Sequence, residues 1–159
     1  MVSRRWFLTM AAALGGAATA GCQRIEKTSA RAVCDVSHPE NGDHDVFTLP
    51  PDVRPVGDSE PILVDLQVPI RQSVLEATNV ELVEVLTGTE TRHRLLVDEG
   101  DDPIGETERY EYDDVIEYAQ SIGFIPQTNR YRLHAVGGGV RLDSITMEFR
   151  CYREVSEER

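Results

Sequence analysis

The sequence RYRLHAVGGGVRLDSITMEFRCY, residues 130–152, carries the clearest strand pattern in the chain. Apolar side chains recur at every second position on both sides of three glycines, at Tyr131, Leu133 and Ala135 before them and at Ile145, Met147, Phe149 and Cys151 after them. This alternation is typical of strands with one buried face, and the glycines favour a tight turn. Val140 and Leu142 have the opposite parity, so a bulge or bend is expected near Asp143. The stretch therefore predicts an antiparallel hairpin.

Further strand patterns precede this hairpin. They cover residues 31–37, 62–68, 80–86, 91–98 and 107–112. The sequence TGTE at residues 87–90 predicts a turn that joins residues 80–86 and 91–98 into a second hairpin. Residues 38–60 and 99–106 are rich in proline, glycine and acidic residues, and they are predicted to be loops.

One short helix is predicted between the two hairpins. Asp113 or Asp114 can cap its start, and Gly123 and Pro126 can end it. Its apolar positions share one helical face, at Val115, Ile116, Ala119 and Ile122. Because the rest of the pattern consists of short strands and turns, the predicted fold class is mainly β, an antiparallel β-sandwich with one short helix.

The C-terminal stretch resembles the end of an immunoglobulin-like or fibronectin-like domain. YRLHA at residues 131–135 and the strand that ends in FRC at residues 149–151 are similar to the last two strands of such a domain. The resemblance covers the final third of the chain, and the Cys-Trp-Cys pattern of true immunoglobulin domains is missing, since the one tryptophan is Trp6. It implies an immunoglobulin-like β-sandwich over residues 31–155, followed by an acidic tail at residues 156–159. In such folds the first and last strands can lie side by side.

The N-terminus has the pattern of a signal peptide. Arg4 and Arg5 form a basic start, and an apolar run with many small residues ends at Cys22. The run over residues 6–21 is shorter than the roughly 20 apolar residues of a transmembrane helix. SRRWFL at residues 3–8 resembles the twin-arginine export motif, which implies export in the folded state.

TAGC at residues 19–22 resembles a lipobox, in which small residues precede a cysteine that is lipidated and becomes the first residue of the mature protein. The resemblance implies removal of residues 1–21 and a diacylglyceryl-type lipid on Cys22, which is sufficient for stable membrane attachment. Residues 22–30 would then form a tether with a reach of at most about 30 Å. We therefore expect a lipid-anchored protein on the extracytoplasmic face of the cell membrane.

Cys34 and Cys151 remain once Cys22 is assigned to the lipid. An even pair of cysteines in an exported protein favours a disulfide. In an immunoglobulin-like fold, neighbouring first and last strands would bring this pair together. Closing a loop on the order of 100 residues contributes about 4–5 kcal/mol in the chain-entropy model.

The chain is strongly acidic. Its formal charge is −12, and removal of residues 1–21 takes away Arg4 and Arg5 but no acid, which leaves −14. The single lysine is Lys27, and this composition resembles that of proteins from salt-loving archaea, whose surface charges are screened over about 3 Å at 1 M salt. Nucleic acid is excluded as a partner because the sequence has no basic stripe. Cations, basic surfaces and other surface proteins are compatible partners.

HPENGDHD at residues 38–45 is the densest group of possible metal ligands. Its candidate ligands for a transition metal are His38, Asp43, His44 and Asp45, and the carboxylate and amide oxygens of the loop also suit Ca²⁺. The spacing does not match a complete EF-hand loop. Two interpretations stay open, a solvated acidic loop and a metal site, and the same two apply to the acidic loop at residues 99–106.

The sequence contains none of the common catalytic signatures, such as a Gly-x-Ser-x-Gly elbow, a His-Glu-x-x-His helix or a dinucleotide fingerprint. His93 and His134 alternate within predicted strands, as half-buried or surface histidines do. We therefore expect no catalysis and no cofactor. The predicted function is that of a membrane-anchored binding or interaction module, and the alternative is a metal-binding accessory lipoprotein that uses residues 38–45.

Overall fold

The computed structural model describes residues 29–39, 43–57, 60–97, 110–124 and 129–156. Within these ranges the chain forms eight strands and one helix. The strands are β1 (Ser29–Ser37), β2 (Asp52–Pro55), β3 (Leu63–Arg71), β4 (Leu82–Thr87), β5 (Glu90–Leu96), β6 (Val115–Phe124), β7 (Asn129–Gly137) and β8 (Val140–Ser156). The helix α1 (Gln72–Ala77) follows β3 directly.

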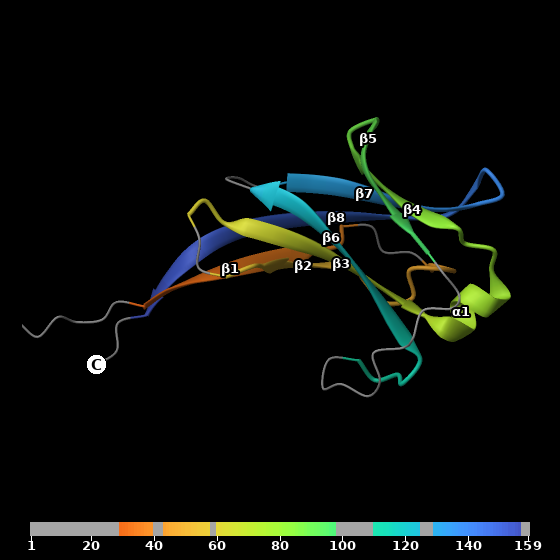
Figure 1. Cartoon of the computed structure of the whole chain (residues 1–159), viewed down its shortest axis with the longest axis horizontal. Coiled ribbons are helices and arrows are strands. Elements are labelled where there is room, and N and C mark those ends of the chain that lie inside the picture. The colour runs from red at the N-terminus through yellow and green to blue at the C-terminus, as the bar shows by residue number, and fades with distance from the viewer. Residues whose placement is uncertain (1–28, 40–42, 58–59, 98–109, 125–128, 157–159) are drawn as a thin grey trace, which may run out of the picture.

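The strands form two antiparallel sheets that pack against each other as a sandwich (Figure 1). The larger sheet has the order β1-β8-β7-β4-β5, and the smaller sheet has the order β2-β3-β6. β1 begins and β8 ends at one end of the molecule, far from α1. The prediction of a mainly β, antiparallel sandwich with one short helix is confirmed, whereas its likeness to immunoglobulin domains stays a prediction.

The C-terminal hairpin is formed by β7 and β8 around Gly138 and Gly139. Both glycines have positive φ angles, 58° and 74°, which other residues adopt less readily. Gly137 is needed for a different reason, because a Cβ atom there would lie 1.8 Å from the backbone oxygen of Asn79. The predicted turn is confirmed. The first of the three glycines, Gly137, also lets the segment between α1 and β4 approach the hairpin closely.

The predicted bulge lies one residue before Asp143. Ala135 is opposite Asp143, but Val136 is opposite Arg141, so Leu142 is the extra residue in β8. This insertion reverses the parity of the strand, as the sequence predicted. It also places Asp143 on the same face as Ile145 and the rest of the core.

The hairpin of β4 and β5 is confirmed as well. Val83 pairs with Leu95 and both are buried, whereas Glu84 pairs with Arg94 on the outer face. The register shifts between Val85 and Leu86, which leaves Arg92 as an extra residue on the edge strand β5.

The predicted helix over residues 113–122 is wrong, because this segment is the strand β6. Val115, Ile116 and Tyr118 are buried, and Ile116 and Tyr118 lie opposite Ile70 and Val68 of β3. Apolar residues at adjacent positions are compatible with a helix or with a strand. This segment is a strand because it pairs with the buried strand β3.

The observed helix α1 was not predicted. It has only six residues and no side-chain cap at its start, so it lacks the usual signals in the sequence. It is held by tertiary contacts: Leu75 is buried, and the Asp114 carboxylate accepts hydrogen bonds from Arg71 and from the backbone N–H of Ser73. β2 was also missed, since it lies in the proline-rich segment that was predicted to be a loop.

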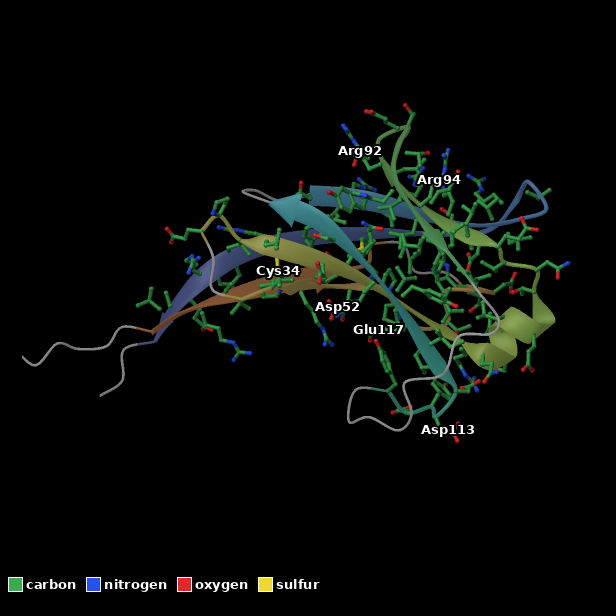
Figure 2. All side chains as sticks on the ribbon, in the orientation of Figure 1. Cys34, Asp52, Arg92, Arg94, Asp113 and Glu117 are labelled. Atoms are coloured by element: carbon green, nitrogen blue, oxygen red, sulfur yellow. A yellow bond between two sulfur atoms is a disulfide. The ribbon has the colours of Figure 1, made fainter. Side chains whose placement is uncertain are left out.

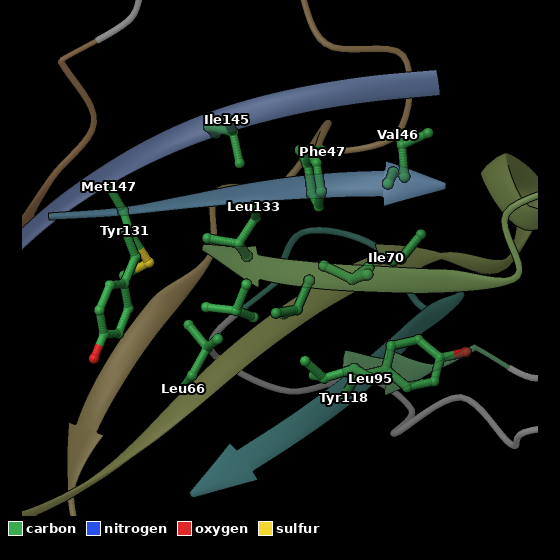
Figure 3. Close-up of a cluster of buried hydrophobic side chains, with 14 of the residues drawn as sticks. Val46, Phe47, Leu66, Ile70, Leu95, Tyr118, Tyr131, Leu133, Ile145 and Met147 are labelled. Carbon is green, nitrogen blue, oxygen red and sulfur yellow. The ribbon is translucent and has the colours of Figure 1, made fainter. Parts of the chain in front are cut away.

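The core lies between the two sheets (Figure 3). Leu66 and Ile70 of β3 face Leu133 of β7 and Met147 of β8, and all four are fully buried. Tyr131 and Phe149 pack edge to face, with their ring centroids 5.3 Å apart. Val46 and Phe47, which come from the loop after β1, complete the core at the end of the sandwich near the bulge.

Candidate functional site

A disulfide joins Cys34 of β1 to Cys151 of β8, which are 117 residues apart in the sequence. The two cysteines are directly opposite each other in the antiparallel register, with their Cα atoms 4.1 Å apart. Both the predicted bond and the predicted neighbourhood of the first and last strands are confirmed. The bond fixes the edge strand β1 to the rest of the larger sheet.

The two histidines of the predicted metal loop have separate partners. The Nε2 atom of His38 lies 2.8 Å from the backbone oxygen of Pro51, and the Nδ1 atom of His44 lies 3.1 Å from Oδ1 of Asp143. Asp43 and Asp45 are exposed. Among the described residues, which leave out residues 40–42, no three histidine, cysteine or acidic side chains gather as a metal site would require. The metal hypothesis therefore stays a prediction.

Asp143 holds the loop after β1 against the bulge of β8. Its Oδ2 atom accepts hydrogen bonds from the backbone N–H groups of Val46, at 2.9 Å, and Phe47, at 3.0 Å. Its Oδ1 atom accepts bonds from His44 and from the backbone N–H of Ser144. Only 10% of this side chain is exposed. Burial acts to raise the pKa of Asp143, but these four donors outweigh it, and the pKa lies below its usual value.

His134 lies on the outer face of the larger sheet, between Glu84 and Ser144 on the neighbouring strands. Partial burial and the nearby Arg141 and Arg132 lower the pKa of His134. Its Nε2 atom is buried and has no partner among the described residues. The imidazole is therefore held neutral at neutral pH, which agrees with the expected half-buried strand histidine.

Cys22, Arg4 and Arg5 lie outside the described residues, as does the acidic loop at residues 99–106. In the part of the chain that the structure covers, no helix has the length and apolar character needed to cross a bilayer.

A groove that the sequence did not predict lies along the β1 and β2 edges of the sandwich. One part of it, about 670 Å³, is lined by residues 31–34 of β1, by β2, and by Gly57 and Glu154. A second part, about 530 Å³, continues past Val36 and His38 and is lined by residues 48–52 and 110–112. Asp52 and Arg54 line both parts. Figure 2 shows Cys34 and Asp52 close together at this side of the molecule.

The chemical groups of this groove suit binding. At one end Tyr112 is stacked by the guanidinium of Arg71, 3.9 Å from the ring centroid, and Tyr110 donates a hydrogen bond to Glu117. At the other end Arg31 is opposite Glu154 in the β1–β8 register. The side chains of the groove therefore combine aromatic rings with charges of both signs. The prolines at positions 50, 51 and 55 were the one sequence feature that could have indicated the edge strand β2, since prolines are often found in or beside short edge strands.

Comparison of this chain with protein-family models, with curated proteins and with solved structures found no match.

Proposed function

We propose that this protein is an extracytoplasmic lipoprotein that acts as a membrane-tethered binding module. The observation that carries the proposal is the position of the lipobox-like Cys22 just before a disulfide-closed sandwich. Six residues lie between Cys22 and Ser29, where β1 begins, so the Cα atoms of these two residues can be at most about 25 Å apart. A lipid on Cys22 would hold the sandwich close to the bilayer.

The disulfide supports the proposed compartment. Such bonds persist in oxidising surroundings outside the cytoplasm and are rare inside it. The Cys34–Cys151 bond and the signal-like N-terminus therefore both support the proposal that the protein is exported. The lipid anchor fixes the location, and the groove beside β1 supplies the groups for contact with a partner.

Cell fractionation of two variants tests the tether and the export route separately. Cys22→Ser is expected to leave the membrane fraction or to accumulate as the uncut precursor, because the lipid acceptor is lost. Arg4→Lys with Arg5→Lys keeps the charge but breaks the twin-arginine motif, and export is expected to stop.

A matched control is Cys34→Ser with Cys151→Ser, which removes the other two cysteines and leaves Cys22 in place. This control is expected to retain the lipid and the membrane association. Mature Cys22→Ser protein that still partitions with membranes would contradict lipid anchoring, and unchanged secretion of the paired lysine variant would contradict the export route.

A further inference from the structure

The part of the groove that Tyr110 and Tyr112 line has the size of a ligand site. Its volume is about 530 Å³, and pockets for small ligands usually have about 300–1,000 Å³. Tyr112 is 39% exposed, and the Arg71 guanidinium stacks on one face of its ring. The Tyr110 hydroxyl donates a hydrogen bond to Glu117 over 2.8 Å. Both rings are therefore positioned by side chains that do not line this cavity.

The described side chains that line the cavity offer more acceptors than charged donors. Asp52 accepts a backbone N–H with one carboxylate oxygen, and its other oxygen lies 4.0 Å from Arg54, too far for a hydrogen bond. Glu111 is exposed and forms no hydrogen bond or ion pair within the described ranges. His38 donates from Nε2 to the oxygen of Pro51, so Nδ1 of the neutral imidazole is an acceptor. Arg54 is the one arginine among these lining residues.

The described groups around the cavity have an excess of negative charge. One arginine and two acids line it. Behind the rings lie Glu117 and the pair of Arg71 and Asp114, whose charged atoms are 3.0 Å apart. These six side chains, two arginines and four acids, have a formal charge of −2. The exposed Asp113 adds to the excess, and Figure 2 shows Asp113 and Glu117 on the same side of the molecule as Asp52.

The charges on the neighbouring strands do not reverse this sign. Asp35 of β1 is opposite Arg150 and lies beside Tyr152, on the outer face of the larger sheet. In the other part of the groove, Arg31 is opposite Glu154, so their formal charges cancel. The cavity beside the two tyrosines is therefore the negative part of the groove.

This combination of groups suits a planar cation with several donors. The acceptors come from three segments, namely β2, the residue that follows β1, and residues 110–112. A guanidinium directs five N–H donors in one plane, whereas an ammonium is a compact point charge. Tyrosine rings also attract cations that lie over their faces. Asp52 and Arg54 line the second part of the groove as well, and its 670 Å³ leave room for a chain that carries the cation.

We propose that this cavity binds the guanidinium group of an arginine on a partner polypeptide. Glu111 and Asp52 accept its N–H donors, Tyr112 packs against its plane, and the polypeptide continues into the part of the groove beside β1. The inference rests on the proposed role as a binding module and names the chemistry of the partner.

An NMR titration of the full-length chain in detergent tests this inference, with N-acetyl-L-argininamide as the probe. The blocked ends of this probe imitate an arginine within a polypeptide. Signals of residues 36–38, 48–54 and 110–112 are expected to shift and to saturate. N-acetyl-L-citrullinamide, the neutral isostere, is expected to cause no saturable shift, and N-acetyl-L-lysinamide is expected to bind at least about threefold more weakly.

Two pairs of variants separate the cavity from the general charge of the chain. Glu111→Gln is expected to weaken binding about fivefold, whereas Glu90→Gln, which removes an exposed acid of the β4–β5 hairpin, should change it less than about twofold. Tyr112→Ala is expected to weaken binding about fivefold. Its control is Tyr152→Ala, since Tyr152 is 37% exposed and also lies near an arginine, and this variant should bind within about twofold of the original chain. All four side chains are exposed, so these variants are expected to fold.

Four results would overturn the inference. Equal affinity for the arginine and citrulline probes would show that charge is not recognised. Equal losses in Glu111→Gln and Glu90→Gln would show only a general attraction of cations to an acidic chain. Shifts confined to residues outside the cavity would place the ligand elsewhere, and tighter binding of methylguanidinium than of N-acetyl-L-argininamide would identify a free small cation as the ligand. None of these results depends on the lipid at Cys22, so failure of the tether and failure of the cavity can be distinguished.

Discussion

Asp143 connects the fold of the sheet to the path of the loop after β1. Its carboxylate accepts four hydrogen bonds, and two of the donors are backbone N–H groups of the buried Val46 and Phe47. A buried donor that loses its acceptor costs about 1–3 kcal/mol. The position of these two core residues therefore depends on a single side chain nearly 100 residues away.

Replacement of this carboxylate with an amide is expected to destabilise the protein. Asp143→Asn places an NH₂ group against backbone N–H donors in either orientation, those of Val46 and Phe47 or that of Ser144, so the free energy of unfolding should fall by about 2–3 kcal/mol. Urea denaturation measures the change. Asp113→Asn, which neutralises an exposed acid, is the control and should change stability by less than about 0.5 kcal/mol. Equal stability of the two variants would show that Asp143 does not hold the loop.

The lowered pKa of Asp143 gives the same contact a pH dependence. A carboxyl whose folded pKa lies below its unfolded value contributes stability that is complete above the unfolded pKa, near 3.8, and is lost as pH falls through the folded pKa. The stability difference between the original chain and Asp143→Asn is therefore expected to persist at neutral pH and to shrink below about pH 4. Denaturation curves at several pH values measure it, and a difference that grows on acidification would contradict this assignment.

The sequence allowed the bulge beside Asp143 to be predicted, but not the partners of this residue. Strand parity is a local property, and the change of parity after Leu142 is visible in the chain itself. The separate partners of His38 and His44 could not be predicted from the sequence. The conformation of a loop is decided by contacts with distant residues, here Pro51 and Asp143.

At the scale of elements, strands with strict alternation were predictable and mixed patterns were not. β7 alternates buried with less buried residues, and β5 alternates exposed residues with half-buried ones and the buried Leu95, so the sequence period agrees with the burial of both strands. β6 begins with two adjacent buried residues, Val115 and Ile116, and this pattern also fits a helix. The groove beside β1 was missed because its other wall, β2, has only four residues within a proline-rich segment.

The disulfide is expected to make a large contribution to stability at this scale, since it closes a loop between residues 117 positions apart. Replacement of both Cys34 and Cys151 by Ala should lower the free energy of unfolding by about 4–5 kcal/mol in the chain-entropy model. Urea denaturation of this variant, compared with Cys22→Ser as the control, measures the effect. Identical unfolding midpoints for the two variants, or titratable thiols at both positions in the unreduced protein, would contradict a structural bond.

For the molecule as a whole, the formal charge of −12 opposes folding through self-repulsion. Several arginines reduce this repulsion locally by pairing with acids, as Arg71 does with Asp114 at 3.0 Å and Arg130 does with Glu148 at 3.5 Å. The acids still outnumber these partners. Screening by salt is therefore expected to stabilise the fold, because the Debye length falls from about 10 Å at 0.1 M to about 3 Å at 1 M.

Thermal unfolding at different salt concentrations tests this expectation. The melting temperature should rise by several degrees between about 0.1 M and 1 M KCl. A variant that neutralises four exposed acids serves as the control, namely Glu76→Gln, Glu81→Gln, Glu111→Gln and Asp113→Asn. It should melt higher at low salt and respond less to added salt. A melting temperature that is independent of salt in both proteins would show that self-repulsion has no significant effect on the stability of the fold.

Intact-mass spectrometry of the protein isolated from its own membrane tests whether a lipid on Cys22 tethers this sandwich to the membrane. We predict a chain that begins at Cys22 and carries the additional mass of a glyceryl group with two hydrocarbon chains. A chain that retains residues 1–21, or that begins at an unmodified Cys22, would contradict the claim.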